Sequence, residues 1–99
     1  MKRKMYIAEY NGGAEYEPAE GGYYVPIKTL SSTSIAYGFK HGKREFKKYI
    51  EELKDYYGEP DFEGKNRVHW TTGKYIGEEY EVRFTSVPEK YERLYYAYC

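Results

Sequence analysis

Tyrosine supplies much of the apolar volume from which this chain must build a core. The chain has 15 tyrosines, whereas its Ile, Leu and Val residues together number 12. Domains usually fill their cores with branched aliphatic side chains, which bury area without a polar atom that needs a partner. Some tyrosines must therefore enter the core. The others are available for binding, because Tyr combines a large rigid face with one hydrogen-bonding tip.

The size and charge of the chain favour one folded domain over residues 1–99. The 20% aromatic content argues against disorder, although 32% of the residues are charged. The net charge is zero, but residues 1–48 carry nine bases and five acids, and residues 49–99 carry seven and eleven. This separation of charge favours self-association or binding to a charged partner.

Cysteine usage and hydropathy indicate the compartment. Cys99 is the single cysteine, so a disulfide within the chain is excluded, as expected in a reducing environment. No apolar run approaches the length of a membrane span. We therefore expect a cytoplasmic protein without membrane contact.

The first forty residues alternate in the way that strands do. The pattern predicts strands over residues 3–10, 23–29 and 35–40. Residues 11–22 hold four glycines, a proline and three glutamates, which predicts a flexible acidic loop, and the Ser/Thr run 31–34 predicts a turn. In the third strand the alternation directs these side chains toward the core: Ile35, Tyr37 and Phe39.

A helix is predicted from about Lys43 to Tyr57. Apolar residues recur at i, i+4, i+7 and i+11, which places them on one face. Gly58 and then Pro60 are typical of the end of a helix. The predicted buried stripe consists of Phe46, Ile50, Leu53 and Tyr57.

A hairpin follows, with Gly77-Glu78 as a tight turn. A bulge at Gly73 would set Trp70 opposite Phe84 and keep both on the inner face. The expected inward residues are Val68, Trp70, Tyr75, Tyr80, Val82 and Phe84.

The C-terminal segment has two interpretations. Ser86 to Glu89 match a helix capping box, and the apolar spacing that follows predicts a helix over 87–97. The alternative is a last strand, because the Tyr-Tyr-Ala-Tyr run at 95–98 suits a sheet.

Together these elements predict an α+β fold. We expect one small domain with a mostly antiparallel sheet of about five strands, one main helix and a C-terminal helix. The predicted order is β-β-β-α-β-β-α.

The most unusual local feature is a run of cations at the beginning of the main helix, within residues 40–48, with acids gathered at its end. Both ends oppose the helix dipole, which favours acids first and bases last. Free N–H groups, the small Gly42 and surrounding cations would suit a phosphate or an acidic side chain. The alternative is a solvated helix face with i,i+4 pairs such as Lys47–Glu51.

The sequence contains no recognisable catalytic or metal motif. His41 and His69 are the only histidines and have no ligand spacing with Cys99, so we predict neither a metal nor a cofactor. Nor does the chain contain a phosphate-binding loop or calcium-loop pattern. We therefore expect a protein that is not an enzyme.

The remaining prediction is a small binding protein of the regulator or inhibitor type. A tyrosine-rich surface and the basic helix start would meet a protein partner with an acidic surface. The alternative is a binder of nucleic acid or a nucleotide, with phosphate at the helix start and bases stacked on tyrosines. The candidate binding residues are Tyr6, Tyr10, Lys40, His41, Gly42, Lys43, Arg44, Lys47, Tyr49 and Tyr56.

Overall fold

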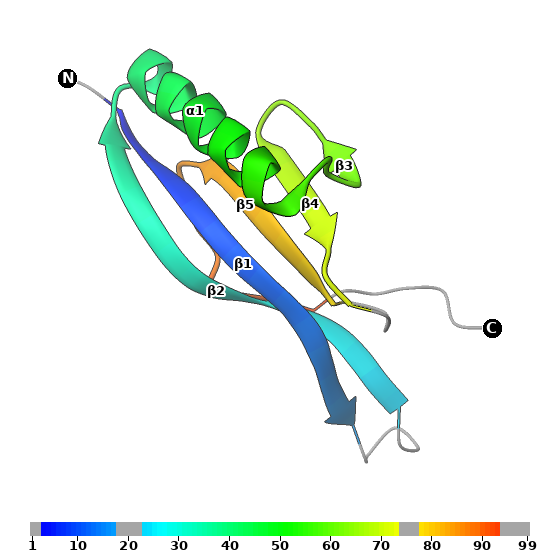
Figure 1. Cartoon of the computed structure of the whole chain (residues 1–99). Coiled ribbons are helices and arrows are strands. Elements are labelled where there is room, and N and C mark those ends of the chain that lie inside the picture. The colour runs from blue at the N-terminus through cyan, green and yellow to red at the C-terminus, as the bar shows by residue number, and fades with distance from the viewer. Residues whose placement is uncertain (1–2, 18–22, 74–77, 94–99) are drawn as a thin grey trace.

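The protein combines an antiparallel sheet with a helix that covers one face of it (Figure 1). The computed structural model describes residues 3–17, 23–73 and 78–93. Across the six-stranded sheet the strand order is β3-β4-β5-β1-β2-β6. The mixed α+β class, the antiparallel sheet and the main helix are thus as predicted. In chain order the elements are β1 (Lys4–Glu17), β2 (Tyr23–Tyr37), α1 (Phe39–Tyr57), β3 (Phe62–Glu63), β4 (Arg67–Thr71), β5 (Glu79–Thr85) and β6 (Tyr91–Arg93).

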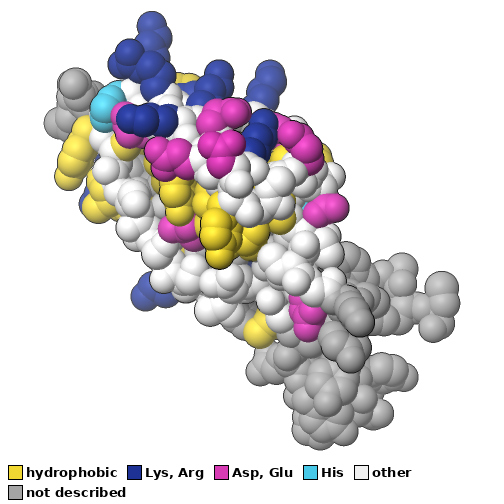
Figure 2. Space-filling model, viewed as in Figure 1, with side chains coloured by type: hydrophobic (Ala, Val, Ile, Leu, Met, Phe, Trp, Pro, Cys, Tyr) yellow, Lys and Arg dark blue, Asp and Glu magenta, His cyan; other side chains and the backbone are white. Residues whose placement is uncertain are grey.

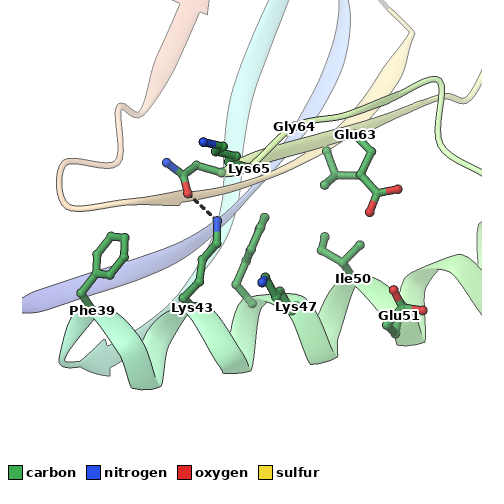
Figure 3. A pocket seen from close by; sticks show the side chains of 11 residues that line it. Phe39, Lys43, Lys47, Ile50, Glu51, Glu63, Gly64 and Lys65 are labelled. Carbon is green, nitrogen blue, oxygen red and sulfur yellow. Dashed lines mark hydrogen bonds between the residues drawn. The ribbon is translucent and has the colours of Figure 1, made fainter.

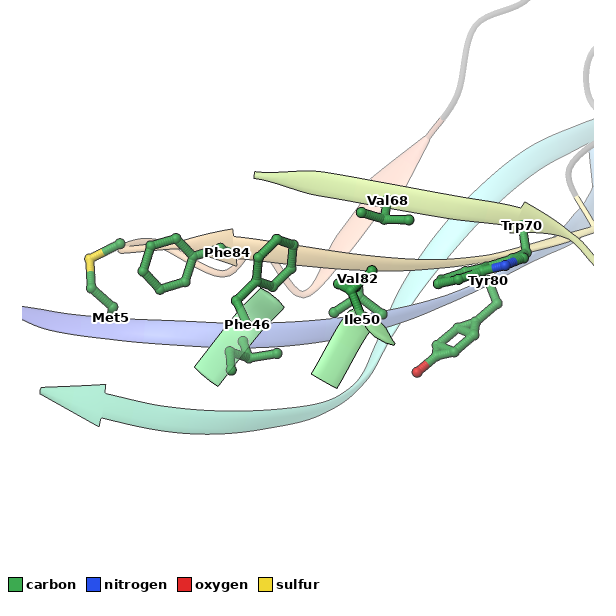
Figure 4. Close-up of a cluster of buried hydrophobic side chains, with 9 residues drawn as sticks. Met5, Phe46, Ile50, Val68, Trp70, Tyr80, Val82 and Phe84 are labelled. Carbon is green, nitrogen blue, oxygen red and sulfur yellow. The ribbon is translucent and has the colours of Figure 1, made fainter. Parts of the chain in front are cut away.

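The hydrophobic core lies between α1 and the sheet (Figure 4). From the helix, Phe46 and Ile50 are buried as predicted, and Leu53 packs against them at the margin. Tyr57 is 43% exposed, although its ring contacts those of Trp70 and Tyr80. The sheet contributes Met5, Ile7, Val68, Trp70, Tyr80, Val82 and Phe84.

The first hairpin is longer than predicted. Residues 11–17, expected to be a loop, belong to β1 and pair with residues 23–29 of β2. Residues 31–34, expected to be a turn, continue β2 through a bulge opposite Glu9 and Tyr10. Pairing along both strands satisfies the backbone, so the glycines and serines do not break it. Residues 18–22 lie outside the described residues.

The side chains at the end of β2 point the opposite way from the prediction, which placed Ile35 and Tyr37 in the core. Ile35 and Tyr37 are 51% and 59% exposed, whereas Ala36 is buried under the helix. Only small side chains fit here because α1 approaches closely. A Cβ on Gly42 would lie 3.4 Å from the Cβ of Ala36 and 2.8 Å from the Phe84 ring.

The helix extends further toward the N-terminus than predicted. It begins at Phe39, directly after Gly38, which takes a φ of 94° that favours glycine. Phe39 is therefore a helical residue at 49% exposure, not a core residue of a strand. The predicted end is confirmed, since Gly58 follows with a φ of 86° and donates its N–H to the Lys54 carbonyl at 2.8 Å.

The second hairpin has the predicted inner face but a different register. Val68, Trp70, Tyr80, Val82 and Phe84 are all buried. Trp70, however, pairs with Tyr80 and not with Phe84. Arg67–Thr71 pair with Glu79–Arg83 in an unbroken register, so the described strands contain no bulge. The register expected from a Gly77-Glu78 turn, with Tyr75 opposite Tyr80, is wrong, because Tyr80 pairs with Trp70. Tyr75 and Gly77 themselves lie outside the described residues.

The predicted C-terminal helix is not confirmed. Residues 86–90 are irregular and residues 91–93 form β6, which pairs with residues 27–29 of β2. The Lys90 carbonyl also accepts the N–H of Leu30 at 2.9 Å. From Lys90 to Arg93 the backbone pairs with β2, so these residues are not helical. Residues 94–99 lie outside the described residues.

The back of the sheet, opposite α1, buries charge. Glu81 is 0% exposed and accepts hydrogen bonds from Lys28 Nζ at 2.6 Å and Arg67 Nε at 2.7 Å. Arg83 Nε also donates to Glu81, and Lys28 forms a second ion pair with Glu79 at 2.7 Å. Burial alone would raise the pKa of Glu81, but the three cations outweigh it and hold the pKa below its ordinary value.

Candidate functional site

A groove with a volume of about 530 Å³ runs between α1 and the turn that joins β3 to β4 (Figure 3). Its apolar floor consists of Phe46, Ile50 and Val68, which belong to the core. Three cations border it: Lys43, Lys47 and Lys65. An apolar floor with a few charged groups at the rim is a common construction for a binding site.

Two elements bring the lysines together. Lys43 and Lys47 are four residues apart, so they lie on the same side of α1. Lys65 reaches the groove from the β3–β4 turn, where Gly64 donates its N–H to the Arg67 carbonyl at 2.7 Å. The turn is also tight at Gly64, since a Cβ there would lie 3.0 Å from the Phe62 ring.

The geometry around Lys43 shows that the rim is electropositive. Its Nζ donates to Asn66 Oδ1 at 2.6 Å, a neutral partner, and lies 5.3 Å from the centroid of the Phe46 ring. Partial burial, together with repulsion from Lys47 and Lys65, lowers the pKa of Lys43 below its ordinary value. An anion in the groove would relieve this repulsion.

The basic surface extends beyond the groove to the first turns of the helix. Lys40 and Arg44 border a second, open depression of about 440 Å³ that includes the half-exposed Phe39 and shares Lys43 and Lys47 with the groove. On the face seen in Figure 2, Lys and Arg side chains gather over the beginning of α1, and acidic side chains lie farther along it.

The acids at the other end of the groove have their own cation. Lys54 forms ion pairs with Glu63 at 2.9 Å and with Glu51 at 3.4 Å. Within the described part of the chain, no carboxylate forms an ion pair with Lys43, Lys47 or Lys65. The negative charge at one end therefore does not neutralise the lysines at the other.

The predicted site residues of the helix start divide between two flanks of α1. Lys40, Lys43, Arg44 and Lys47 lie together, as the sequence led us to expect. His41 lies on the other flank, beside β2.

The role predicted for Gly42 is wrong. It is buried against the sheet and donates its N–H to the Gly38 carbonyl at 2.9 Å, so its backbone is not available to an anion.

The predicted tyrosine patch does not form. Tyr10 is 1% exposed on the back of the sheet, where its hydroxyl donates to the Glu89 carbonyl at 2.7 Å and the Arg83 guanidinium lies 4.5 Å from its ring centroid. Tyr6 also faces the back and pairs with Ile35. Strand alternation therefore places both tyrosines on the face opposite the helix.

The two helical tyrosines are also apart from the groove. Tyr49 donates a hydrogen bond to Glu9 at 2.6 Å on the β2 side of α1. Burial and the Glu9 carboxylate raise the pKa of Tyr49. Tyr56 is 80% exposed near the helix end, with its ring against that of Tyr57.

Three residues that line the groove were not predicted from the sequence: Phe39, Lys65 and Asn66. Phe39 was assigned to a strand because its alternation with Tyr37 continues across Gly38. The Gly64-Lys65-Asn66 run is a turn signal that could have been found. Its position beside the helix depends on the pairing of β3 with β4, where Phe62 lies opposite His69.

The structure offers no sign of a metal centre or a membrane span among its described residues. No group of three or more His, Cys, Asp or Glu side chains there could hold a metal ion. No helix in the same residues is long and apolar enough to cross a membrane.

The chain matches no protein-family model, no curated protein and no solved structure. The function is therefore inferred from the geometry of the groove.

Proposed function

We propose that this protein is a small non-enzymatic binding protein of the regulator or inhibitor type, and that the groove beside α1 takes an acidic segment of a protein partner. The observation that carries this proposal is the convergence of Lys43, Lys47 and Lys65 on one apolar floor without a carboxylate among the described residues to neutralise them. Carboxylates of a partner would supply the missing charge, and its apolar side chains would pack against the half-exposed Phe39 at the basic end of the groove.

The shape of the site favours a peptide segment over a flat acidic surface. The groove is lined from both sides, by α1 and by the β3–β4 turn, so a segment would lie between them. Its length extends from Phe39 at the basic end to Glu51 and Glu63 at the other. A segment with its acids at one end and a neutral or basic residue at the other would match this polarity.

The nucleic-acid alternative has lost part of its support. It required tyrosines to stack bases near the cations, and Tyr10 is buried while Tyr6 faces the back of the sheet. Phe39 is the exposed aromatic ring beside Lys40, Lys43 and Arg44. The protein-partner proposal does not need a stacking platform, so it fits these residues better.

Two probes separate these functions: a short synthetic peptide rich in Glu and Leu, and a single-stranded oligonucleotide. We expect the peptide to shift the amide resonances of α1 and the β3–β4 turn, and to show a shallow dependence of affinity on salt. A nucleic-acid site would instead favour the oligonucleotide, with a steep log–log slope from counterion release. If the peptide shifted amide resonances of the protein outside the groove and not within it, the proposed site would be refuted.

A further inference from the structure

The second half of β2 forms an open edge of the sheet (Figure 1). Its first half is covered by β6, which pairs with residues 27–29. From Ser31 to Tyr37, β2 follows β1 on one side, and no described strand pairs with it on the other. Such an edge presents backbone N–H and C=O groups that can pair with a strand from another molecule.

The usual protection of an edge is weak here. Natural edge strands carry charges, prolines or bulges that discourage pairing. Residues 31–37 contain neither a charge nor a proline. The bulge lies at their beginning, so residues 32–37 pair regularly with β1. Ile35 and Tyr37 project from this stretch at 51% and 59% exposure.

Beside the open edge, α1 presents a row of exposed side chains at i, i+4, i+7 and i+11. The row follows one flank of the helix and borders, with Ser34 and Ile35, a depression of about 440 Å³. Base and acid alternate along it. The four side chains are His41, Glu45, Lys48 and Glu52.

The middle of this row lies level with Ser34. Near one end, Gly42 packs against Ala36. Near the other, Tyr49 and Ser32 both donate hydrogen bonds to Glu9. Ser34, midway between Ser32 and Ala36, is therefore beside the helix between residues 45 and 48.

When this row of side chains is set against a reversed copy of itself, each acid lies opposite a base. Consider a two-fold axis that is perpendicular to the sheet and lies at its open edge beside Ser34. It would pair β2 with β2 of a second copy and set the two helices antiparallel on the same face of the joined sheet. Glu45 would then face Lys48 of the second copy, and His41 would face its Glu52. The reverse pairs would form by symmetry.

The distances allow these pairs. The two β1 strands would be three strand spacings apart, about 14 Å. Because α1 packs across β1, β2 and β5, the helices would be separated by a similar distance, beyond the roughly 8–10 Å of closely packed helices. Extended Lys and Glu side chains can bridge such a gap.

We propose that this protein forms a symmetric dimer in which the open edges of β2 pair antiparallel and the alternating charges of the two α1 helices face each other. The reversed charge match explains why the occupant is a second copy. A foreign strand could use the edge, but it would not require a row of charges that is symmetric about Ser34. The basic groove is on the other flank of α1, so this dimer and the proposed partner site are independent.

The test is sedimentation equilibrium of the full chain over a wide range of concentrations. We expect the wild type to show a concentration-dependent dimer. Lys48→Glu should weaken it about tenfold or more, because the new carboxylate would face Glu45 of the second copy, and the two-fold axis repeats this repulsion. The exchange variant Glu45→Lys/Lys48→Glu should return the dissociation constant to within about threefold of the wild type.

A matched control and a second measurement distinguish this dimer from other kinds of association. Lys47→Glu makes the same change of charge on the groove flank and should leave the dimer unaffected. Amide hydrogen exchange should show protection over residues 31–37 that increases with protein concentration. A wild type that stays monomeric, an exchange variant no better than Lys48→Glu, or dimers without edge protection would each overturn the proposal.

Discussion

Two groups of cations lie on opposite faces of the same sheet, and they have opposite surroundings. On the back, Lys28 forms ion pairs with Glu79 and Glu81, and Arg67 forms one with Glu81. Both acids belong to β5. The lysines of the groove on the helix face form no ion pair with a described carboxylate, and Lys43 donates to the neutral Asn66. Among the described residues, the first group is satisfied within the chain, whereas the second group is not.

The difference shows which cations the fold requires. Charges removed from water are tolerated when opposite charges and hydrogen bonds replace the lost hydration, and Glu81 has three such partners. The groove lysines repel each other, so the fold gains no charge pairing from placing them together. We infer that the back-face cations serve stability and that the groove cations serve binding.

The largest expected effect comes from Glu81→Gln. It would leave Lys28, Arg67 and Arg83 around a neutral amide, and removal of one partner from a buried ion pair costs about 3–5 kcal/mol. Urea denaturation of the variant measures this loss. As a matched control, Val82→Ala changes the adjacent residue on the opposite, apolar face and should cost about 2 kcal/mol. A loss below about 1 kcal/mol for Glu81→Gln would show that the back-face network is not needed for stability.

The same pair of variants should differ in their response to pH. The folded protein lowers the pKa of Glu81 and of Glu9, the latter through hydrogen bonds from Ser32, Tyr49 and Tyr80 that outweigh its burial. In acid the unfolded chain therefore binds more protons than the folded one, and stability must fall as pH falls below about 4.3.

Denaturation midpoints between neutral and acid pH measure this slope. Val82→Ala should lower the whole curve and keep its slope. Glu81→Gln should have a shallower slope, because only the contribution of Glu9 and the remaining acids is left. Equal slopes in the wild type and Glu81→Gln would contradict the lowered pKa of Glu81.

The smallest expected effect concerns the groove. Lys47→Met and Lys65→Met should each change the free energy of unfolding by less than about 0.5 kcal/mol, with any change in the stabilising direction, because each removes repulsion. Lys28→Met on the back face is the matched variant and should destabilise by roughly 3 kcal/mol. Thermal or urea unfolding of the three variants tests the contrast. Clear destabilisation by Lys47→Met would give the groove lysines a structural role.

The parts of the fold that were predictable from sequence are those fixed by local periodicity. The apolar stripe of α1 and the alternation of β4 and β5 identified most of the core, since burial forces one face of each element to be apolar. Gly58 marked the end of the helix for a local steric reason.

The errors arose where pairing between distant segments decides the outcome. Glycines and serines suggested a loop at 11–17 and a turn at 31–34, but the long pairing of β1 with β2 overrides these preferences. The direction of Tyr37 depended on the close approach of Gly42 to Ala36, which no local pattern contains.

The candidate site was predicted in part for the same reason. Lys40, Lys43, Arg44 and Lys47 are neighbours along one helix, so their spacing was sufficient to group them. Lys65 joins them through the β3–β4 turn, a contact between elements. The tyrosines were grouped by composition, and the sheet separates Tyr10 from the helix face altogether.

The most direct test of the proposed function compares charge reversals on the two flanks of α1. The Lys47→Glu/Lys65→Glu variant reverses two of the groove cations, and Lys48→Glu reverses one on the other flank. We expect the first to weaken binding of the Glu- and Leu-rich peptide about tenfold or more in a calorimetric titration, and the second to leave it unchanged within about twofold. Equal peptide affinity for the wild type and the groove variant would contradict the account.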